Sequence, residues 1–128
     1  MKKIYIDKIT REDMKLHPNW LYLFGDNLEK VGMGGQAGEM RGEPNAQGIP
    51  TKIRPSMDSD AFFSDDMFGQ IKKFYDELFI IILAAFRAGK FEMLVIPSAG
   101  IGTGLARLKE KAPKIYEYLL LKLNELGE

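Results

Sequence analysis

The sequence contains no cysteine and only one histidine, His17, among its 128 residues. The absence of cysteine excludes disulfides, thiolate catalysis and cysteine-bound zinc. A single histidine also argues against a histidine-based metal site and against a Ser-His-Asp triad. Lysine and arginine together number 18, as do aspartate and glutamate, so no overall charge excess points to nucleic acid or an acidic membrane. We therefore expect neither a metal nor a cofactor.

Long apolar segments are also absent. The longest apolar run, residues 78–86, is far shorter than the roughly 20 residues that a membrane helix needs. Residues 1–7 lack the apolar core of a signal peptide. Hydrophobic residues make up 45% of the chain and charged residues 28%, which is typical of a globular protein. These features predict a single domain over residues 1–128, cytoplasmic, monomeric and without a membrane partner.

Apolar segments and breaker residues predict strands that alternate with helices. We expect strands at residues 3–6, 20–24, 48–53 and 92–97, the third at a sheet edge because of Pro50. A capping box at Thr10 and Asp13 predicts a short helix, and another is expected after Gly34. The alternation predicts an α/β architecture with a mostly parallel sheet.

Two longer helices complete the predicted pattern. Residues 64–66 (Ser-Asp-Asp) are typical of a cap for a helix that continues to Ala88, and residues 109–126 form an amphipathic helix. Because residues 78–86 are nearly all apolar, we expect the first of these helices to be buried on most sides. A strand at residues 79–83 is the alternative.

Glycines cluster in two segments, which together hold ten of the 13 in the chain, seven at residues 25–48 and three at residues 100–104. In the second segment, an apolar strand ends at Pro97, passes through a glycine-rich turn and enters a helix. Such a turn leaves backbone N–H groups free to hold an anion. Two such loops indicate a ligand with more than one phosphate, or with a phosphate and a sugar. Plain surface turns, in which glycine supplies a positive φ, are the alternative.

Two familiar nucleotide motifs do not fit. Residues 32–37 match G-x-G-x-x-A, but the expected strand ends near Phe24, too early for a dinucleotide-binding turn. The P-loop pattern G-x-x-x-x-G-K-[ST] is absent from the chain.

Residues 95–108 and the helix after them resemble the second phosphate-binding loop of macro domains. The resemblance is to the branch that contains terminal ADP-ribose protein glycohydrolases and DNA ADP-ribosyl glycohydrolase antitoxins. The Ile-Gly-x-Gly-Leu-x-x-Leu pattern of that branch is matched by residues 101–108. Residues 21–27 with Gly34 and Gly35 resemble the first macro loop, and residues 24–52 are similar to small, phage-type macro-like proteins.

The resemblance implies a three-layer α/β/α fold with a mostly parallel mixed sheet. It also implies a cleft that binds ADP-ribose or another NAD-derived nucleotide, free or attached to a macromolecule. In it, Asn27 would contact the distal ribose, and Gly34 and Gly35 would let the backbone approach that ribose. The implied pyrophosphate donors are the N–H groups of Gly100, Ile101, Gly102, Thr103 and Gly104, with the hydroxyl of Ser98.

The resemblance also implies a possible hydrolytic mechanism. In the similar glycohydrolases a strand lysine attacks or polarises C1″ of the ribose, and the carboxylate of a loop aspartate moves the proton. Lys52 lies where that lysine would fall, but Ala106 occupies the aspartate position. Either another carboxylate, such as Asp26 or Glu43, replaces it, or the lysine mechanism is absent. Asp7 is displaced by one residue from the aspartate that contacts adenine in macro domains.

Three functional hypotheses remain open at this point: an ADP-ribosyl hydrolase, a non-catalytic nucleotide reader or sponge, and a structural domain without a ligand. Several side chains also have two interpretations. Arg41 and Arg54 could steer a polyanion or simply be solvated, and Phe62 and Phe63 could stack on a base or close the core. Asp65 and Asp66 are expected to cap a helix.

Overall fold

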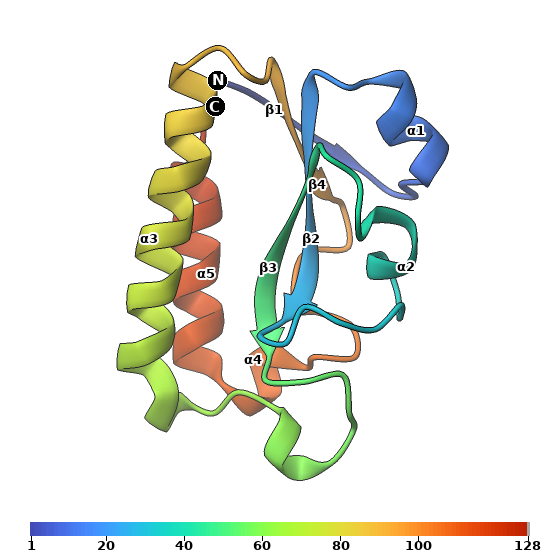
Figure 1. The fold of residues 1–128 in the computed structure, drawn as a ribbon. Coiled ribbons are helices and arrows are strands. Elements are labelled where there is room, and N and C mark those ends of the chain that lie inside the picture. The colour runs from blue at the N-terminus through green and yellow to red at the C-terminus, as the bar shows by residue number, and fades with distance from the viewer. Residues whose placement is uncertain (128) are drawn as a thin grey trace.

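The computed structural model describes residues 1–127, and at its centre is a four-stranded sheet in the order β1-β4-β2-β3 (Figure 1). Its strands are β1 (Lys2–Ile6), β2 (Trp20–Asn27), β3 (Ala46–Lys52) and β4 (Met93–Pro97). Neighbouring strands are parallel throughout, and the only antiparallel pairing within residues 1–127 is an isolated bridge between Lys52 and Phe62. The sheet is therefore parallel rather than mixed.

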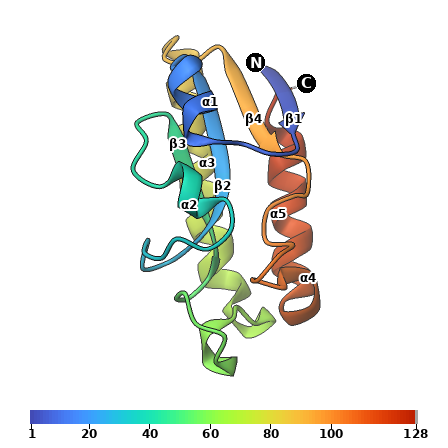
Figure 2. The same cartoon turned by 90° about the vertical axis from the view of Figure 1, so that its right-hand side faces the viewer.

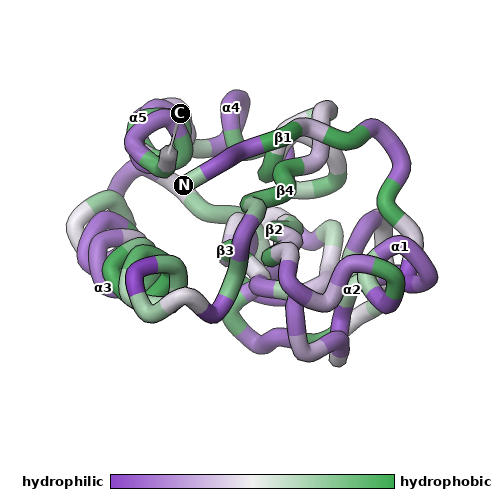
Figure 3. Tube along the Cα trace, turned by 90° about the horizontal axis from the view of Figure 1, so that it is seen from above, coloured by the Kyte–Doolittle hydropathy of each residue, from purple (hydrophilic) through white to green (hydrophobic). Residues whose placement is uncertain are grey.

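Helices cover both faces of the sheet, which confirms the expected three-layer α/β/α fold. One face carries α3 (Phe68–Arg87) and α5 (Pro113–Glu125), and the other carries α1 (Arg11–Leu16) and α2 (Ala37–Met40) (Figures 1 and 2). Figure 3 shows the same arrangement from above. The remaining elements are short: α4 (Leu108–Lys111) and the 3₁₀ helices η1 (Ser59–Ala61) and η2 (Asp65–Met67).

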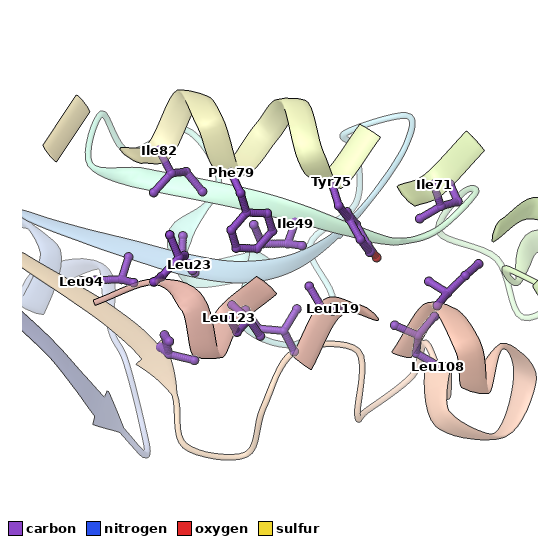
Figure 4. Close-up of a cluster of buried hydrophobic side chains, with 14 of the residues drawn as sticks. Leu23, Ile49, Ile71, Tyr75, Phe79, Ile82, Leu94, Leu108, Leu119 and Leu123 are labelled. Carbon is purple, nitrogen blue, oxygen red and sulfur yellow. The ribbon is translucent and has the colours of Figure 1, made fainter. Parts of the chain in front are cut away.

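Each face of the sheet has its own hydrophobic core. Side chains alternate along β2, so Leu21 and Leu23 face α3 and α5, while Tyr22 and Phe24 face α1 and α2. The larger core, shown in Figure 4, also joins the two long helices to β3 and β4. Burial on both faces explains why the central strands β2 and β4 are almost continuously apolar.

The expected edge strand is confirmed, because β3 lies at the end of the sheet and contains Pro50. Strand β2 extends beyond the expected stop at residues 25–27 and ends at Asn27. The capping box is present at the start of α1, where Asp13 N donates to Thr10 Oγ1 (3.1 Å) and Thr10 N donates to Asp13 Oδ2 (2.9 Å).

The prediction that the long helix is buried on most sides is wrong. Residues 79–83 are helical, not a strand, but only one stripe of α3 faces the core. Tyr75, Phe79 and Ile82 are buried, whereas Ile80 and Ile81 are 65% and 63% exposed. A helix that packs against a sheet on one side buries one face only, whatever residues lie on the other.

The predicted caps and boundaries of the long helices also need correction. Asp65 does not cap α3; its carboxylate accepts hydrogen bonds from the N–H groups of Lys114 (3.1 Å) and Ile115 (3.3 Å) at the start of α5. The expected single helix over residues 109–126 is divided into α4 and α5 at Pro113, which is the first residue of α5. Proline is favoured at the first position of a helix because the N–H that it lacks would have no acceptor within that helix. The same missing N–H prevents proline from continuing the preceding helix.

The connections after β2 and β4 leave the sheet in opposite directions. The chain crosses from β2 to α2 on one face, and from β4 to α4 and α5 on the other (Figure 2). Such a divergence between neighbouring parallel strands opens a crevice at their carboxyl ends, where ligands of open α/β sheets bind. Within residues 1–127, no helix combines the length and the apolar character that crossing a membrane requires.

Candidate ligand-binding cleft

A cleft of about 710 Å³ opens at the carboxyl ends of all four strands. Its walls come from Asp7 after β1, residues 25–27 of β2, Thr51 and Lys52 of β3, and Pro97 at the end of β4. The loops that follow the strands contribute the rest, mainly residues 31–37, 55–57 and 99–106. This volume is within the usual range for small-molecule sites. Below, residues 28–36 are called the first loop and residues 98–107 the second loop.

The second loop contains a run of backbone donors without partners. Gly100 N donates to Pro97 O (2.9 Å) and Leu108 N donates to Gly102 O (2.9 Å), which closes the loop at both ends. Between them, the N–H groups of residues 101–106 have no hydrogen-bond acceptor within residues 1–127. All of these residues except Ile101 line the cleft. Thr103, Gly104 and Leu105 are exposed, so their N–H groups are open to water or to a ligand, whereas Gly102 and Ala106 are buried and an N–H group left unsatisfied there would be costly.

The loop is held in one shape by close packing. Gly102 has a φ of +81°, and a Cβ there would lie 3.0 Å from Leu108 Cδ2 and 3.2 Å from Thr51 Cγ2. Thr103 Oγ1 donates to Ala99 O (2.7 Å), and the Ile101 side chain is buried in the larger core. The donors are therefore presented by a braced segment.

Ser98 lies outside the residues that line the cleft. Its N–H continues the pairing with β1 by donating to Ile6 O (2.9 Å), and its hydroxyl donates to Asp7 Oδ1 (3.3 Å). Asp7 itself lines the cleft. The hydroxyl that was expected near a phosphate therefore contacts an aspartate at the cleft wall instead.

Asn27 shapes the first loop with its own side chain. Its Nδ2 donates to Val31 O (2.7 Å), and the side chain is buried at the end of β2. Gly34 and Gly35 line the cleft as expected, and Gly35 has a φ of +58°. A Cβ at Gly34 would lie 3.6 Å from Leu105 Cδ1, so the two loops approach each other across the cleft.

Asp26 is engaged by Arg41, an interaction that the sequence did not indicate. Arg41 Nη1 donates to Asp26 Oδ2 (3.1 Å) and Nη2 to Oδ1 (2.5 Å), and the Asp26 side chain is only 6% exposed. Arg41 Nε also donates to Gly32 O (2.8 Å). Arg41 is therefore neither solvated nor steering a polyanion, since it fixes the first loop to β2. A Cβ at Gly48 would lie 2.6 Å from Asp26 Oδ2, which explains the glycine there.

Lys52, unlike Arg41, is a cation of the cleft that has no carboxylate partner within residues 1–127. It ends β3, is 8% exposed, and donates through Nζ to Ser56 O. Its Nζ lies 4.6 Å from the centroid of the Phe62 ring. Burial, followed by the nearby charge of Arg54, lowers the pKa of Lys52 below its usual value. A desolvated lysine of this kind can donate to an anion or, once deprotonated, act as a nucleophile.

The other candidates lie away from the cleft or serve the core. Glu43 pairs with Arg11 (2.8 Å), and Arg54 pairs with Asp60. Phe62 and Phe63 are buried, which confirms the core interpretation.

Ala106, at the position of the expected acid, lines the cleft. The structure adds one residue that the sequence did not suggest, Gln36, whose buried Oε1 has no hydrogen-bond partner in the described chain.

No group of three or more histidine, aspartate or glutamate side chains within residues 1–127 is placed to hold a metal ion. The ionisable residues that line the cleft are Asp7, Asp26, Arg41 and Lys52. Since Asp26 and Arg41 neutralise each other, the chemistry available is that of one carboxylate, one buried lysine and a set of peptide N–H groups.

Residues 4–122 match the family of unknown function DUF7831, and the chain belongs to this family. No curated protein and no solved structure matches the chain.

Proposed function

We propose that this member of the DUF7831 family binds ADP-ribose, or a closely related NAD-derived nucleotide, in the cleft at the carboxyl ends of its strands, as a monomer in the cytoplasm. The observation that carries the proposal is the run of N–H groups at residues 101–106 that have no acceptor in the described part of the chain, on a braced loop that lines a cleft of about 710 Å³. Consecutive peptide N–H groups of this kind favour phosphate oxygens.

The weak net charge of the cleft fits recognition by hydrogen bonds. Lys52 is its only cation that is not paired with a carboxylate in the described chain, and Asp7 offsets it. A diphosphate would thus be held mainly by backbone donors, which need no counter-charge and fix its orientation. The first loop, which meets the second at Gly34 and Leu105, would lie over the attached sugar. The resemblance of residues 95–108 to a macro-domain phosphate loop supports the same ligand.

Hydrolysis of an ADP-ribosyl linkage, on an ADP-ribosylated macromolecule, is the second candidate function. Lys52 supports it, because this lysine is buried in the cleft wall and has a lowered pKa. The carboxylates favour a non-catalytic reader or sponge instead, since Arg41 occupies both oxygens of Asp26 and Ala106 cannot carry a proton. Binding is therefore the conclusion, and turnover is a separate question.

Titration calorimetry with ADP-ribose tests binding. We expect one site per chain, and the absence of binding at millimolar ligand with the fold intact would refute the proposal. Incubation with an ADP-ribosylated protein or oligonucleotide then separates the two forms. Release of ADP-ribose by the native protein but not by Lys52→Ala indicates a hydrolase, and binding without release indicates a reader.

A further inference from the structure

Methionine supplies all the sulfur of this chain, which has seven methionines and no cysteine. Met14 and Met40 are completely buried, whereas Met33 and Met57 line the cleft and are 62% and 52% exposed. Peroxides oxidise a thioether to a sulfoxide where they can reach it. Both methionines of the cleft are therefore open to this modification.

Met57 differs from Met33 in what its sulfur contacts. Lys52 Nζ donates to Met57 Sδ (3.7 Å) and to the carbonyl oxygen of Ser56. The Met33 sulfur accepts no hydrogen bond within residues 1–127. Because a thioether is a weak acceptor, the sulfur of Met57 engages Lys52 only loosely. This sulfur thus lies beside the one cation of the cleft that lacks a carboxylate partner in the described chain.

The loop that carries Met57 is closed at its base. Residues 53–60 extend beyond the carboxyl end of β3 (Figure 1), and Ile53 N donates to Ala61 O (2.8 Å) where the two sides of the loop meet. This closure restricts how far Met57 can move from Lys52. A chemical change at the Met57 sulfur therefore takes place next to the ammonium group.

We infer that Met57 is a site of reversible oxidation, and that its sulfoxide engages the Lys52 ammonium group and so withdraws this cation from the ligand. The oxidant is a peroxide. The sulfur attacks one peroxide oxygen, so an S–O bond forms and the O–O bond breaks. Met57 loses two electrons, and the departing oxygen takes the proton of the transferred one and leaves as water. The sulfoxide oxygen carries partial negative charge and accepts a stronger hydrogen bond from an ammonium group than a thioether does.

Oxidation has one effect that needs a ligand and one that does not. The first rests on the proposed function: an ammonium group held by the sulfoxide offers less to a phosphate, so ADP-ribose binding should weaken about fivefold, as the loss of one hydrogen bond does. The second concerns Lys52 alone. A stronger hydrogen bond to the charged form should raise the pKa of Lys52. The two methionine sulfoxide reductases, one for each epimer, should reverse both effects.

Peroxide treatment of the native protein, Met57→Leu and Met33→Leu tests the inference. Leucine has a similar volume and cannot be oxidised. Each protein is compared with its own untreated form, so that any effect of the substitution itself cancels. Peptide mass spectrometry gives the extent of oxidation at each methionine. The Cε carbon resonance of Lys52, followed against pH, gives its pKa, and calorimetry gives the affinity for ADP-ribose.

Oxidation should raise the pKa of Lys52 and weaken ADP-ribose binding in the native protein and in Met33→Leu, and should change neither in Met57→Leu. The inference is overturned if Met57 resists the peroxide, or if its sulfoxide leaves the pKa of Lys52 or the affinity unchanged. Equal effects in oxidised Met57→Leu would overturn it as well, because another methionine would then be responsible. If the untreated protein does not bind ADP-ribose, the proposed function fails, and the Lys52 titration alone decides the inference.

Discussion

Arg41, the residue that follows α2, donates hydrogen bonds to both carboxylate oxygens of Asp26, which lies at the carboxyl end of β2. The same guanidinium donates to the carbonyl oxygens of Gly32 (2.8 Å) and Val31 (3.2 Å). One side chain therefore fixes the path of the first loop. The ion pair also withholds Asp26 from proton transfer, although Asp26 lines the cleft.

Replacing Arg41 should both destabilise the fold and loosen the first loop. We expect Arg41→Met to lower the free energy of unfolding by about 3 kcal/mol, because it leaves a buried carboxylate without its partner. Urea denaturation measures this loss, and ADP-ribose binding should weaken in parallel. Arg54→Met is the matched control, since its pair with Asp60 is largely exposed, and it should cost less than about 1 kcal/mol. Equal losses in the two variants would contradict the anchoring role of Arg41.

Two glycines of the second loop should respond differently to alanine. Gly102→Ala places a side chain at a φ of +81° and within 3.0 Å of Leu108. It should cost about 1–3 kcal/mol of stability and deform the donor run. At Gly104 a Cβ would meet no atom of residues 1–127 within 4 Å, so Gly104→Ala should change stability by less than about 0.5 kcal/mol. Thermal unfolding compares the stability of the two variants. If Gly102→Ala were as stable as the native protein, the loop would not be braced as described.

The order of strands and helices was largely predictable, because it depends on local patterns. Apolar runs mark the strands, Pro50 marks the sheet edge, and Thr10 with Asp13 marks the start of α1. The second loop was also foreseeable, since a strand followed by closely spaced glycines needs a tight turn. Pro113 indicates a break between α4 and α5, but the amphipathic pattern continues on either side of it and favoured a single helix.

The contacts that define the site depend on residues far apart in the sequence, and these could not be predicted. Asp65 caps a helix that begins about 50 residues later, so its local context indicated the wrong helix. Arg41 pairs with Asp26 because the tertiary fold brings the two side chains together, and no rule of sequence spacing predicts that pair. The outer face of α3 is apolar although it does not pack against the sheet, so a prediction from composition overestimates how much of the helix is buried.

Lys52 should make stability rise with pH in the alkaline range. Its pKa in the folded protein lies below the 10.5 of an exposed lysine, mainly because burial disfavours the charged form. Between these two values the unfolded chain binds more protons than the folded one, so the free energy of unfolding increases with pH. Lys52→Met should remove this increase and raise the melting temperature at neutral pH.

Lys72 provides the control of opposite sign. Its hydrogen bond and charge interaction with Asp76 raise the pKa of Lys72. The stability contributed by that contact is present below 10.5 and is lost as the pH rises through the raised pKa. Lys72→Met should therefore not raise the melting temperature at neutral pH. If Lys52→Met lowered it instead, the buried ammonium would be a net stabilising group.

Asp65 should stabilise α5 from outside the helix. Its carboxylate accepts from the N–H groups of Lys114 and Ile115, which have no partner within the helix. Asp65→Ala should cost about 1 kcal/mol in chemical denaturation, as the loss of a helix cap does. Asp66→Ala is the control, because Asp66 meets only the Ser64 hydroxyl within residues 1–127, and it should have little effect. A larger loss of stability in Asp66→Ala than in Asp65→Ala would contradict the assignment of the cap to Asp65.

The most direct test of the central claim follows the backbone amides of the second loop while ADP-ribose is added. In a two-dimensional ¹H–¹⁵N titration, the amide signals of residues 101–106 should shift most, and those of Gly34 and Gly35 should follow with the same dissociation constant. A native spectrum in which residues 101–106 remain unmoved at millimolar ADP-ribose would contradict the claim that these N–H groups form a phosphate site.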